Sequence, residues 1–155
     1  RQISRICVFK YRPHKSKLPI MYQFSVKLRV RYAETDQMGY CYYGNYAQYY
    51  QVARVETLKS LGISYKKLED KGVLLPVSDF SIKYILPALY DQELTIRCTF
   101  KELTDYKIKF DYQTYNEESK LLNFGNTTLV FVDKETKKLV NCPKPIRDLL
   151  INLKP

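Results

Sequence analysis

Two carboxylates in one loop, Glu34 and Asp36, are the first candidates for chemistry in this sequence. If the backbone is extended there, residues two apart point the same way and the two could work as an acid–base pair. Residue type and spacing alone favour simpler roles, because Asp is common in turns and Glu is usually solvated or ion-paired. The loop must therefore be judged by what surrounds it.

The sequence lacks the residues that several common catalytic mechanisms require. The only histidine is His14, far from the loop, which argues against a Ser-His-Asp triad or a Cys-His pair. The four cysteines are widely spaced and form no CxxC, so we predict no metal site, no redox motif and no cofactor. Cys41, near the loop, is interpreted as a small buried residue.

The loop is predicted to connect a strand to a long helix. Alternating apolar residues predict a half-buried strand from Tyr22 to Tyr32. Apolar and aromatic residues at helical spacing predict a helix from Asn45 to Leu61. We expect the Asn45 side chain to cap this helix, and Gly62 to end it in a left-handed conformation.

Strands dominate the rest of the chain. The predicted segments are 73–77 with 80–84 as one interrupted strand, 94–101, 106–113 and 122–132, followed by a short helix at 146–150. One long central helix wrapped by an antiparallel sheet of about five strands satisfies this order, which predicts an α+β fold.

The loop and helix start also resemble a family signature. The segment from Tyr32 to Tyr46, with Thr35-Asp36 and Gly39 before Asn45-Tyr46, resembles the 4-hydroxybenzoyl-CoA thioesterase-like hot-dog family, in particular its YbgC-type acyl-CoA thioesterases. The match continues at 53–56 and, more weakly, at 84–88 and Asp91. It spans roughly residues 22–150 and implies the hot-dog fold.

The resemblance implies an acyl-CoA thioesterase of the thioester hydrolase class. Asp36 takes the place of the catalytic carboxylate, as nucleophile or general base. Tyr43 takes the place of the residue whose backbone N–H holds the thioester oxygen, a role that a helix N-terminus suits. Many relatives carry His at that position, and its absence here keeps open a non-catalytic acyl-CoA-binding hot-dog protein. An acyl-carrier-protein thioesterase, which shares the chemistry, is the other alternative.

The same resemblance extends to the substrate and the assembly. We expect Gly44, Asn45, Tyr46 and Lys83 to contact the substrate, with Lys83 among the cations for the CoA phosphates. A single sheet with an uncovered edge also favours pairing of two chains, so we expect a homodimer or homotetramer with acyl-CoA as the ligand.

Charge and hydropathy limit the other partners. The formal net charge is +10, but residues 1–20 hold six basic side chains and no acid, so the remainder has only a modest surplus. We therefore predict no nucleic-acid partner. No apolar run is long enough to cross a bilayer, so we expect no membrane insertion and a cytoplasmic location. We also expect residues 1–20 to be a disordered or non-native tail before a single domain, 21–155.

Overall fold

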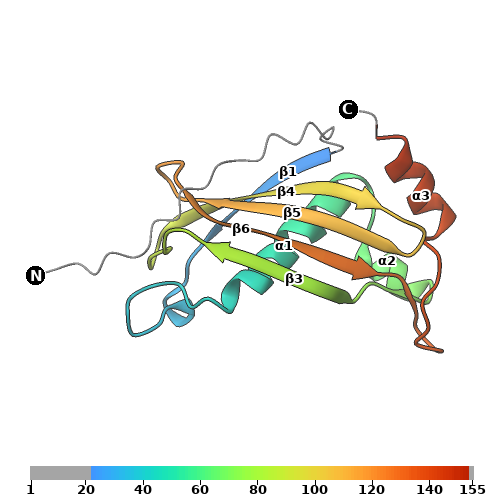
Figure 1. The fold of residues 1–155 in the computed structure, drawn as a ribbon, viewed down its shortest axis with the longest axis horizontal. Helices are drawn as coiled ribbons and strands as arrows, with labels where there is room; N and C mark the ends of the chain where they lie inside the picture. The colour runs from blue at the N-terminus through green and yellow to red at the C-terminus, as the bar shows by residue number, and fades with distance from the viewer. Residues whose placement is uncertain (1–21, 154–155) are drawn as a thin grey trace, which may run out of the picture.

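A computed structural model of the chain describes residues 22–153, in which a five-stranded antiparallel sheet lies against one long helix (Figure 1). The expectation for residues 1–20 falls outside this range. The elements are β1 (Tyr22–Arg29), the 3-10 turn η1 (Tyr32–Glu34), α1 (Asn45–Ser60), α2 (Tyr65–Asp70), β2 (Val73–Leu74), β3 (Val77–Tyr84), β4 (Glu93–Leu103), β5 (Lys107–Tyr115), β6 (Leu121–Val130), β7 (Val132–Asp133) and α3 (Lys144–Ile151). The predicted α+β hot-dog fold is confirmed.

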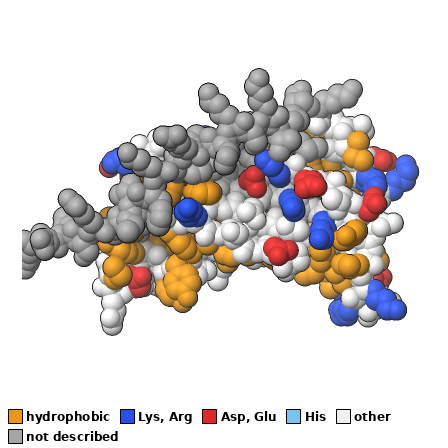
Figure 2. Space-filling view, viewed as in Figure 1, with side chains coloured by type: hydrophobic (Ala, Val, Ile, Leu, Met, Phe, Trp, Pro, Cys, Tyr) orange, Lys and Arg blue, Asp and Glu red, His pale blue; other side chains and the backbone are white. Residues whose placement is uncertain are grey.

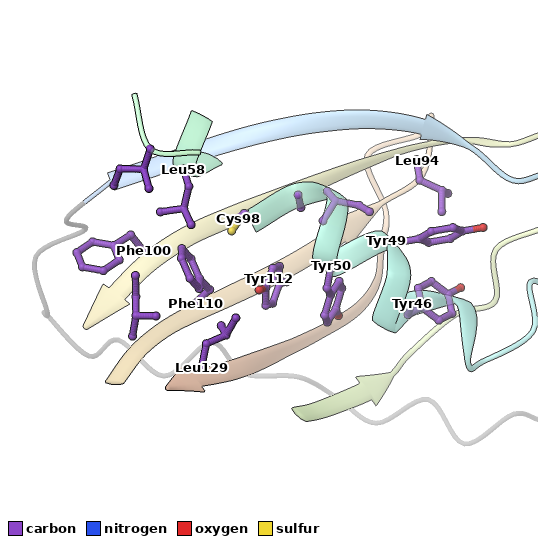
Figure 3. Close-up of a cluster of buried hydrophobic side chains, with 14 of the residues drawn as sticks. Tyr46, Tyr49, Tyr50, Leu58, Leu94, Cys98, Phe100, Phe110, Tyr112 and Leu129 are labelled. Carbon is purple, nitrogen blue, oxygen red and sulfur yellow. The ribbon is translucent and has the colours of Figure 1, made fainter. Parts of the chain in front are cut away.

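The core lies between α1 and the concave side of the sheet. The sheet order is β1-β4-β5-β6-β3, so β1 and β3 are its edges. On α1, Tyr50 stacks on Tyr112 of β5, with ring centroids 4.2 Å apart and planes 7° from parallel. Phe100 and Phe110 extend the same apolar layer toward the far end of the helix (Figure 3). Burial of these large rings supplies much of the apolar driving force for folding.

The alternating patterns of β4 and β5 are confirmed. In β4, Leu94, Ile96, Cys98 and Phe100 are buried, while the residues between them are more exposed. The same alternation runs through β5, the central strand. Because successive side chains of a strand point to opposite faces, one face packs on α1 and the other meets solvent.

The first strand is shorter than predicted. β1 ends at Arg29, and Tyr32 is an exposed residue of η1 rather than an inward residue of the strand. The cause is Glu34, whose carboxylate accepts a hydrogen bond from the Arg31 backbone N–H at 2.8 Å and turns the chain back on itself. Glu34 ends this turn, and Thr35, which separates it from Asp36, has an extended backbone with φ -98° and ψ 155°.

The ends of α1 follow the prediction at one end only. Gly62 has φ +84°, so the predicted left-handed residue after the helix is confirmed. At the other end the residue in the capping position is Gly44, and the Asn45 side chain does not cap the helix. Its amide instead donates to the Glu34 carbonyl oxygen at 2.7 Å, which ties the helix start to the loop.

The segment after α1 differs most from the prediction. Val73 and Leu74 form β2, which pairs with β7 in a separate two-stranded sheet, while β3 begins at Val77. Pro76, which has no N–H for a ladder, separates the two. The sequence analysis also missed α2, which Ser64 caps by accepting a hydrogen bond from the Lys67 N–H through its hydroxyl.

Charges of both signs share the solvent-facing side of the sheet. Figure 2 shows acidic and basic side chains interspersed on the visible face, and Lys101–Asp111 and Lys109–Glu102 form ion pairs there. This mixture lacks the single-signed surface typical of a nucleic-acid interface. Within residues 22–153, no helix is long and apolar enough to span a membrane.

Candidate active site

A pocket of about 220 Å³ opens where the loop, the start of α1 and the end of β3 meet. It combines one carboxylate with a wall of mostly aromatic and apolar side chains. Its lining residues are Asp36, Tyr40, Cys41, Tyr43, Tyr46, Tyr84, Ile85, Leu86 and Pro87. The structure therefore brings Asp36 and Tyr43, the two predicted catalytic positions, into one pocket.

One carboxylate oxygen of Asp36 is held by the backbone of its own loop. Asp36 Oδ1 accepts from the N–H groups of Met38 at 2.9 Å and Tyr40 at 3.2 Å. The loop closes on itself through hydrogen bonds from Asp36 N to the Tyr40 oxygen and from Gly39 N to the Asp36 oxygen, both 2.9 Å. Gly39 makes this turn with φ +76°, which glycine adopts without strain.

The second oxygen, Oδ2, receives no hydrogen bond from any of residues 22–153, and Asp36 is exposed. The carboxylate is thus oriented by one oxygen while the other remains available to a substrate or a water. That division suits a nucleophile or a general base, since either role needs a fixed direction and a free lone pair.

The loop is anchored to the segment that follows β3. Cys41 N donates to the Ala88 oxygen at 2.8 Å, and Tyr40 pairs with Leu89 in an isolated antiparallel bridge. Thr35 pairs with Cys41 in the same manner, which closes the loop at its base. Asp36 is therefore held by backbone contacts on both sides rather than placed at a loose loop tip.

Glu34 connects the loop to the helix. Its buried carboxylate accepts from the Arg31 backbone at 2.8 Å, from the Arg31 guanidinium at 2.7 and 3.1 Å, and from the Tyr49 hydroxyl at 2.7 Å. Its carbonyl oxygen accepts from Tyr42 N at 2.8 Å and from the Asn45 amide at 2.7 Å. One residue thus ties the end of β1, the loop and the first turns of α1 together.

The interactions of the Glu34 carboxylate give it a different role from that of Asp36. Burial acts to raise the pKa of the Glu34 carboxyl, but the hydrogen bonds from Arg31 and Tyr49 outweigh burial and lower it. Glu34 is therefore an ionised, ion-paired structural residue, as the simpler prediction had it. It points toward Arg31 and Tyr49 and does not line the pocket that contains Asp36.

The backbone of Tyr43 lies close to the start of α1. The peptide that joins Tyr42 to Tyr43 is fixed because the Tyr42 oxygen accepts from Asn45 N at 3.0 Å. Within the described part of the chain, the Tyr43 N–H on that same peptide has no hydrogen-bond acceptor. It lies two residues before α1, where the helix dipole favours negative charge. The Tyr43 side chain itself is 64% exposed.

Three tyrosine rings form one wall of the pocket. The ring of Tyr84 lies 5.6 Å from that of Tyr46 and 6.5 Å from that of Tyr43, measured between centroids. Burial raises the pKa of both Tyr46 and Tyr84 above the usual range, so both phenols stay protonated at neutral pH. They can donate hydrogen bonds and pack against an acyl group, but they cannot serve as bases.

Cys41 is a poor nucleophile in this setting. Burial is the largest influence on its thiol and raises its pKa, so the thiolate that a nucleophile requires is disfavoured. The side chain is buried, and its sulfur approaches the Tyr49 hydroxyl at 3.5 Å. The interpretation of Cys41 as a small buried residue is confirmed. Among residues 22–153, Asp36 is the only carboxylate that lines the pocket.

The predicted substrate-binding residues occupy different positions. Tyr46 lines the pocket, whereas Gly44 and Asn45 shape the start of α1 beside it. At Gly44 a Cβ would lie 2.7 Å from the Tyr42 ring, so a larger residue would push that ring aside. Lys83 is exposed on β3 and does not line the pocket, because it alternates with Tyr84, which does. Their contacts with substrate remain predictions.

Tyr84 and the stretch Ile85–Pro87 were not predicted as site residues. The signal was present, since residues 84–88 belong to the weaker part of the family signature. Nothing local in the sequence places this segment next to the helix start, because the contact depends on the pairing of β3 with β6 at the sheet edge.

Comparison with known proteins identifies relatives that match most of the chain. The thioesterase-like superfamily matches residues 30–150. The "Putative acyl-CoA thioesterase YneP" of Bacillus subtilis is 35% identical over 122 residues, which cover 79% of this chain and 88% of that protein. The acyl-CoA thioesterase YbgC of Haemophilus influenzae is 27% identical, over 84% of this chain and 96% of its own.

A solved structure agrees with these relatives. The DHNA-CoA thioesterase of Staphylococcus aureus superposes with a TM-score of 0.80 at 28% identity, over 83% of this chain and 88% of that one. The predicted resemblance to the hot-dog thioesterases is therefore confirmed by sequence and by fold.

Proposed function

The chain belongs to the thioesterase-like superfamily, and we propose that it hydrolyses acyl-CoA thioesters with Asp36 as its catalytic carboxylate. It is a thioester hydrolase. The acyl-CoA substrate is supported by the names of its relatives in Bacillus subtilis and Haemophilus influenzae. The observation that supports the residue assignment is that Asp36 and Tyr43 line the same pocket, while within residues 22–153 Asp36 Oδ2 accepts no hydrogen bond and the Tyr43 N–H donates none.

The reaction needs two things that this pocket contains. Water must be added to the thioester carbonyl, and the negative charge that develops on its oxygen must be stabilised. The Tyr43 N–H, near the positive end of the α1 dipole, supplies the stabilising donor. The products are the free carboxylic acid and CoA as a thiol.

Asp36 can act in either of two ways. As a nucleophile, Oδ2 bonds to the carbonyl carbon, expels the CoA thiolate and leaves an anhydride that water then cleaves. As a general base, Oδ2 takes a proton from a water that attacks the carbonyl carbon directly. Neither route requires an imidazole, and residues 22–153 contain none.

A single turnover in heavy-oxygen water separates the two routes. With enzyme in excess over acyl-CoA, nucleophilic attack forms the anhydride, and water that then attacks its aspartyl carbonyl leaves the first solvent oxygen in the Asp36 carboxylate, which mass spectrometry of the digested protein detects. General-base catalysis places it in the released acid from the first turnover. Label in neither the peptide nor the acid, with substrate unconsumed, would contradict hydrolysis at this site.

The proposal includes recognition of the CoA part of the substrate. CoA carries phosphates that need cations, and Lys83, exposed on β3 beside the pocket residue Tyr84, is our candidate. Lys83→Ala should raise KM for acyl-CoA while kcat changes little. The acyl-carrier-protein alternative is tested by comparing hydrolysis of the same acyl group on CoA and on the carrier protein.

The proposal also covers assembly and location. We place two chains edge to edge through β3, as a homodimer or a homotetramer, and the protein in the cytoplasm. The support for pairing is the edge position of β3 and the exposure of Val77, Phe80 and Tyr84 along it. A screen of acyl-CoA substrates across chain lengths, including benzoyl-type acyl groups, would define the acyl specificity.

A further inference from the structure

Tyr84 reaches from the sheet to the backbone of the helix start. It is the last residue of the edge strand β3, and it pairs with Asn123 of β6. Its hydroxyl donates to the carbonyl oxygen of Tyr43 at 3.0 Å, across 41 positions of sequence. Tyr84 therefore combines two features. Its ring lines the pocket, and its hydroxyl is hydrogen-bonded to the residue that carries the proposed oxyanion donor.

The Tyr43 carbonyl lies outside the hydrogen-bond ladder of α1, which begins at Asn45. A carbonyl in this position needs a partner from elsewhere, and the Tyr84 hydroxyl provides one. On the other side of Tyr43, the Tyr42 N–H is bonded to the Glu34 oxygen and the Tyr42 oxygen to Asn45 N. The peptide that carries the Tyr43 N–H is thus held through the Tyr42 oxygen, and the peptide on the other side of the Tyr43 Cα is held by the Tyr84 hydroxyl.

We propose that Tyr84 is a positioning residue that aims the Tyr43 N–H at the thioester oxygen through its hydrogen bond to the Tyr43 carbonyl. The inference rests on the proposed function. Fixed donors are effective because they need no reorganisation as charge develops, and a small misplacement weakens them steeply. The hydroxyl acts through the backbone, whereas the ring serves the pocket wall.

The state of the phenol agrees with this role. Burial raises the pKa of Tyr84, so its hydroxyl keeps the proton that it donates to the Tyr43 oxygen. The ring is supported independently of the hydroxyl by its contacts with Tyr46 and Tyr43. Tyr84→Phe therefore removes the hydrogen bond and keeps the wall, while Tyr84→Ala removes both.

The test compares these two variants by kinetics and by ligand binding. Tyr84→Phe should lower kcat roughly tenfold, less than the ~100- to 1000-fold loss of an entire oxyanion donor, with KM nearly unchanged. A trifluoromethyl ketone analogue of the acyl-CoA, which mimics the oxyanion, should bind more weakly by the same factor. An S-alkyl-CoA thioether, which lacks the carbonyl, should bind as before. Tyr84→Ala should in addition weaken the binding of the thioether, because it also removes the ring from the pocket wall.

The control is Tyr106→Phe, which removes an exposed phenol in the turn between β4 and β5, far from the pocket along the sheet. It should match the wild type, and thermal unfolding should show all variants folded. Unchanged kcat and ketone binding in folded Tyr84→Phe would overturn the inference. A loss of thioether binding as large as the loss of ketone binding in this variant would also overturn it. A wild-type protein that cleaves no acyl-CoA would defeat the proposed function itself, and the inference with it, so the wild type distinguishes the two failures.

Discussion

Glu34 and Asp36 show how two carboxylates two residues apart acquire different roles. Glu34 is 8% exposed, and its carboxylate accepts hydrogen bonds from Arg31 and Tyr49, so its charge stabilises the loop. Asp36 is exposed, and only one of its oxygens is occupied, by backbone N–H groups. Neither environment could be predicted from their spacing, because Glu34 depends on the 3-10 turn at Tyr32–Glu34 and Asp36 on the tight turn that follows it.

Substitutions at Tyr43 test whether the backbone or the phenol matters. Tyr43→Phe and Tyr43→Ala should keep substantial activity, since the side chain is mostly exposed and the proposed donor is the N–H. Tyr43→Pro removes that N–H and should cost ~100- to 1000-fold in kcat. Steady-state kinetics on folded variants provides the measurement. Equal damage from Phe and Pro would show that the hydroxyl, rather than the amide, is the active group.

At the scale of elements, local patterns predicted local structure. Strict alternation identified β4 and β5, and helical spacing with a terminal glycine identified α1, because each signal lies within a few residues. The order β1-β4-β5-β6-β3 could not be predicted in this way, since pairing depends on contacts far apart in the chain. The separate pairing of β2 with β7 was missed for the same reason.

The link between loop and helix should be visible in stability. Glu34→Gln removes a buried, ion-paired acceptor and should lower the free energy of unfolding by about 1 to 3 kcal/mol at pH 7. Chemical denaturation provides the measurement. Glu118→Gln is the matched control, because Glu118 pairs with Lys120 on the exposed surface, where an ion pair contributes little to stability. Equal effects of the two substitutions would contradict the role assigned to Glu34.

The same contribution should depend on pH in a defined direction. The pKa of Glu34 is lowered in the folded state, so its stabilising effect is fully present above the unfolded value of about 4.3 and is lost as pH falls through the folded pKa. The difference in unfolding free energy between wild type and Glu34→Gln should therefore be constant near neutral pH and shrink in acid. A difference that grows on acidification would mean that the pKa is raised instead.

At the scale of the whole molecule, the proposed pairing of two chains depends on the edge strand β3. Val77 at its start is 42% exposed, next to a row of backbone groups that β6 does not pair. Val77→Lys should shift the protein toward monomers in light scattering and lower activity in parallel, because a charge at a strand edge opposes pairing. Leu139→Lys, at a 58% exposed apolar residue outside the large sheet, should change neither.

These measurements distinguish an assembly that activity requires from one that activity does not require. Loss of activity on dilution of the wild type, together with monomerisation by Val77→Lys, would support active sites that need two chains. A wild-type protein that is monomeric and fully active would contradict the proposed pairing, and it would leave Asp36 and its pocket to be tested within one chain.

The most direct test of the central claim is the hydrolysis of acyl-CoA by Asp36→Asn. The amide is nearly the same shape as the carboxylate and can still accept from the Met38 and Tyr40 N–H groups, but it is neither nucleophilic nor basic. With Asp148→Asn on α3 as an active control, kcat should fall at least ~100-fold while thermal unfolding and thioether binding stay as in the wild type. Hydrolysis at a near wild-type rate by the folded Asp36→Asn protein would contradict the assignment of Asp36 as the catalytic carboxylate.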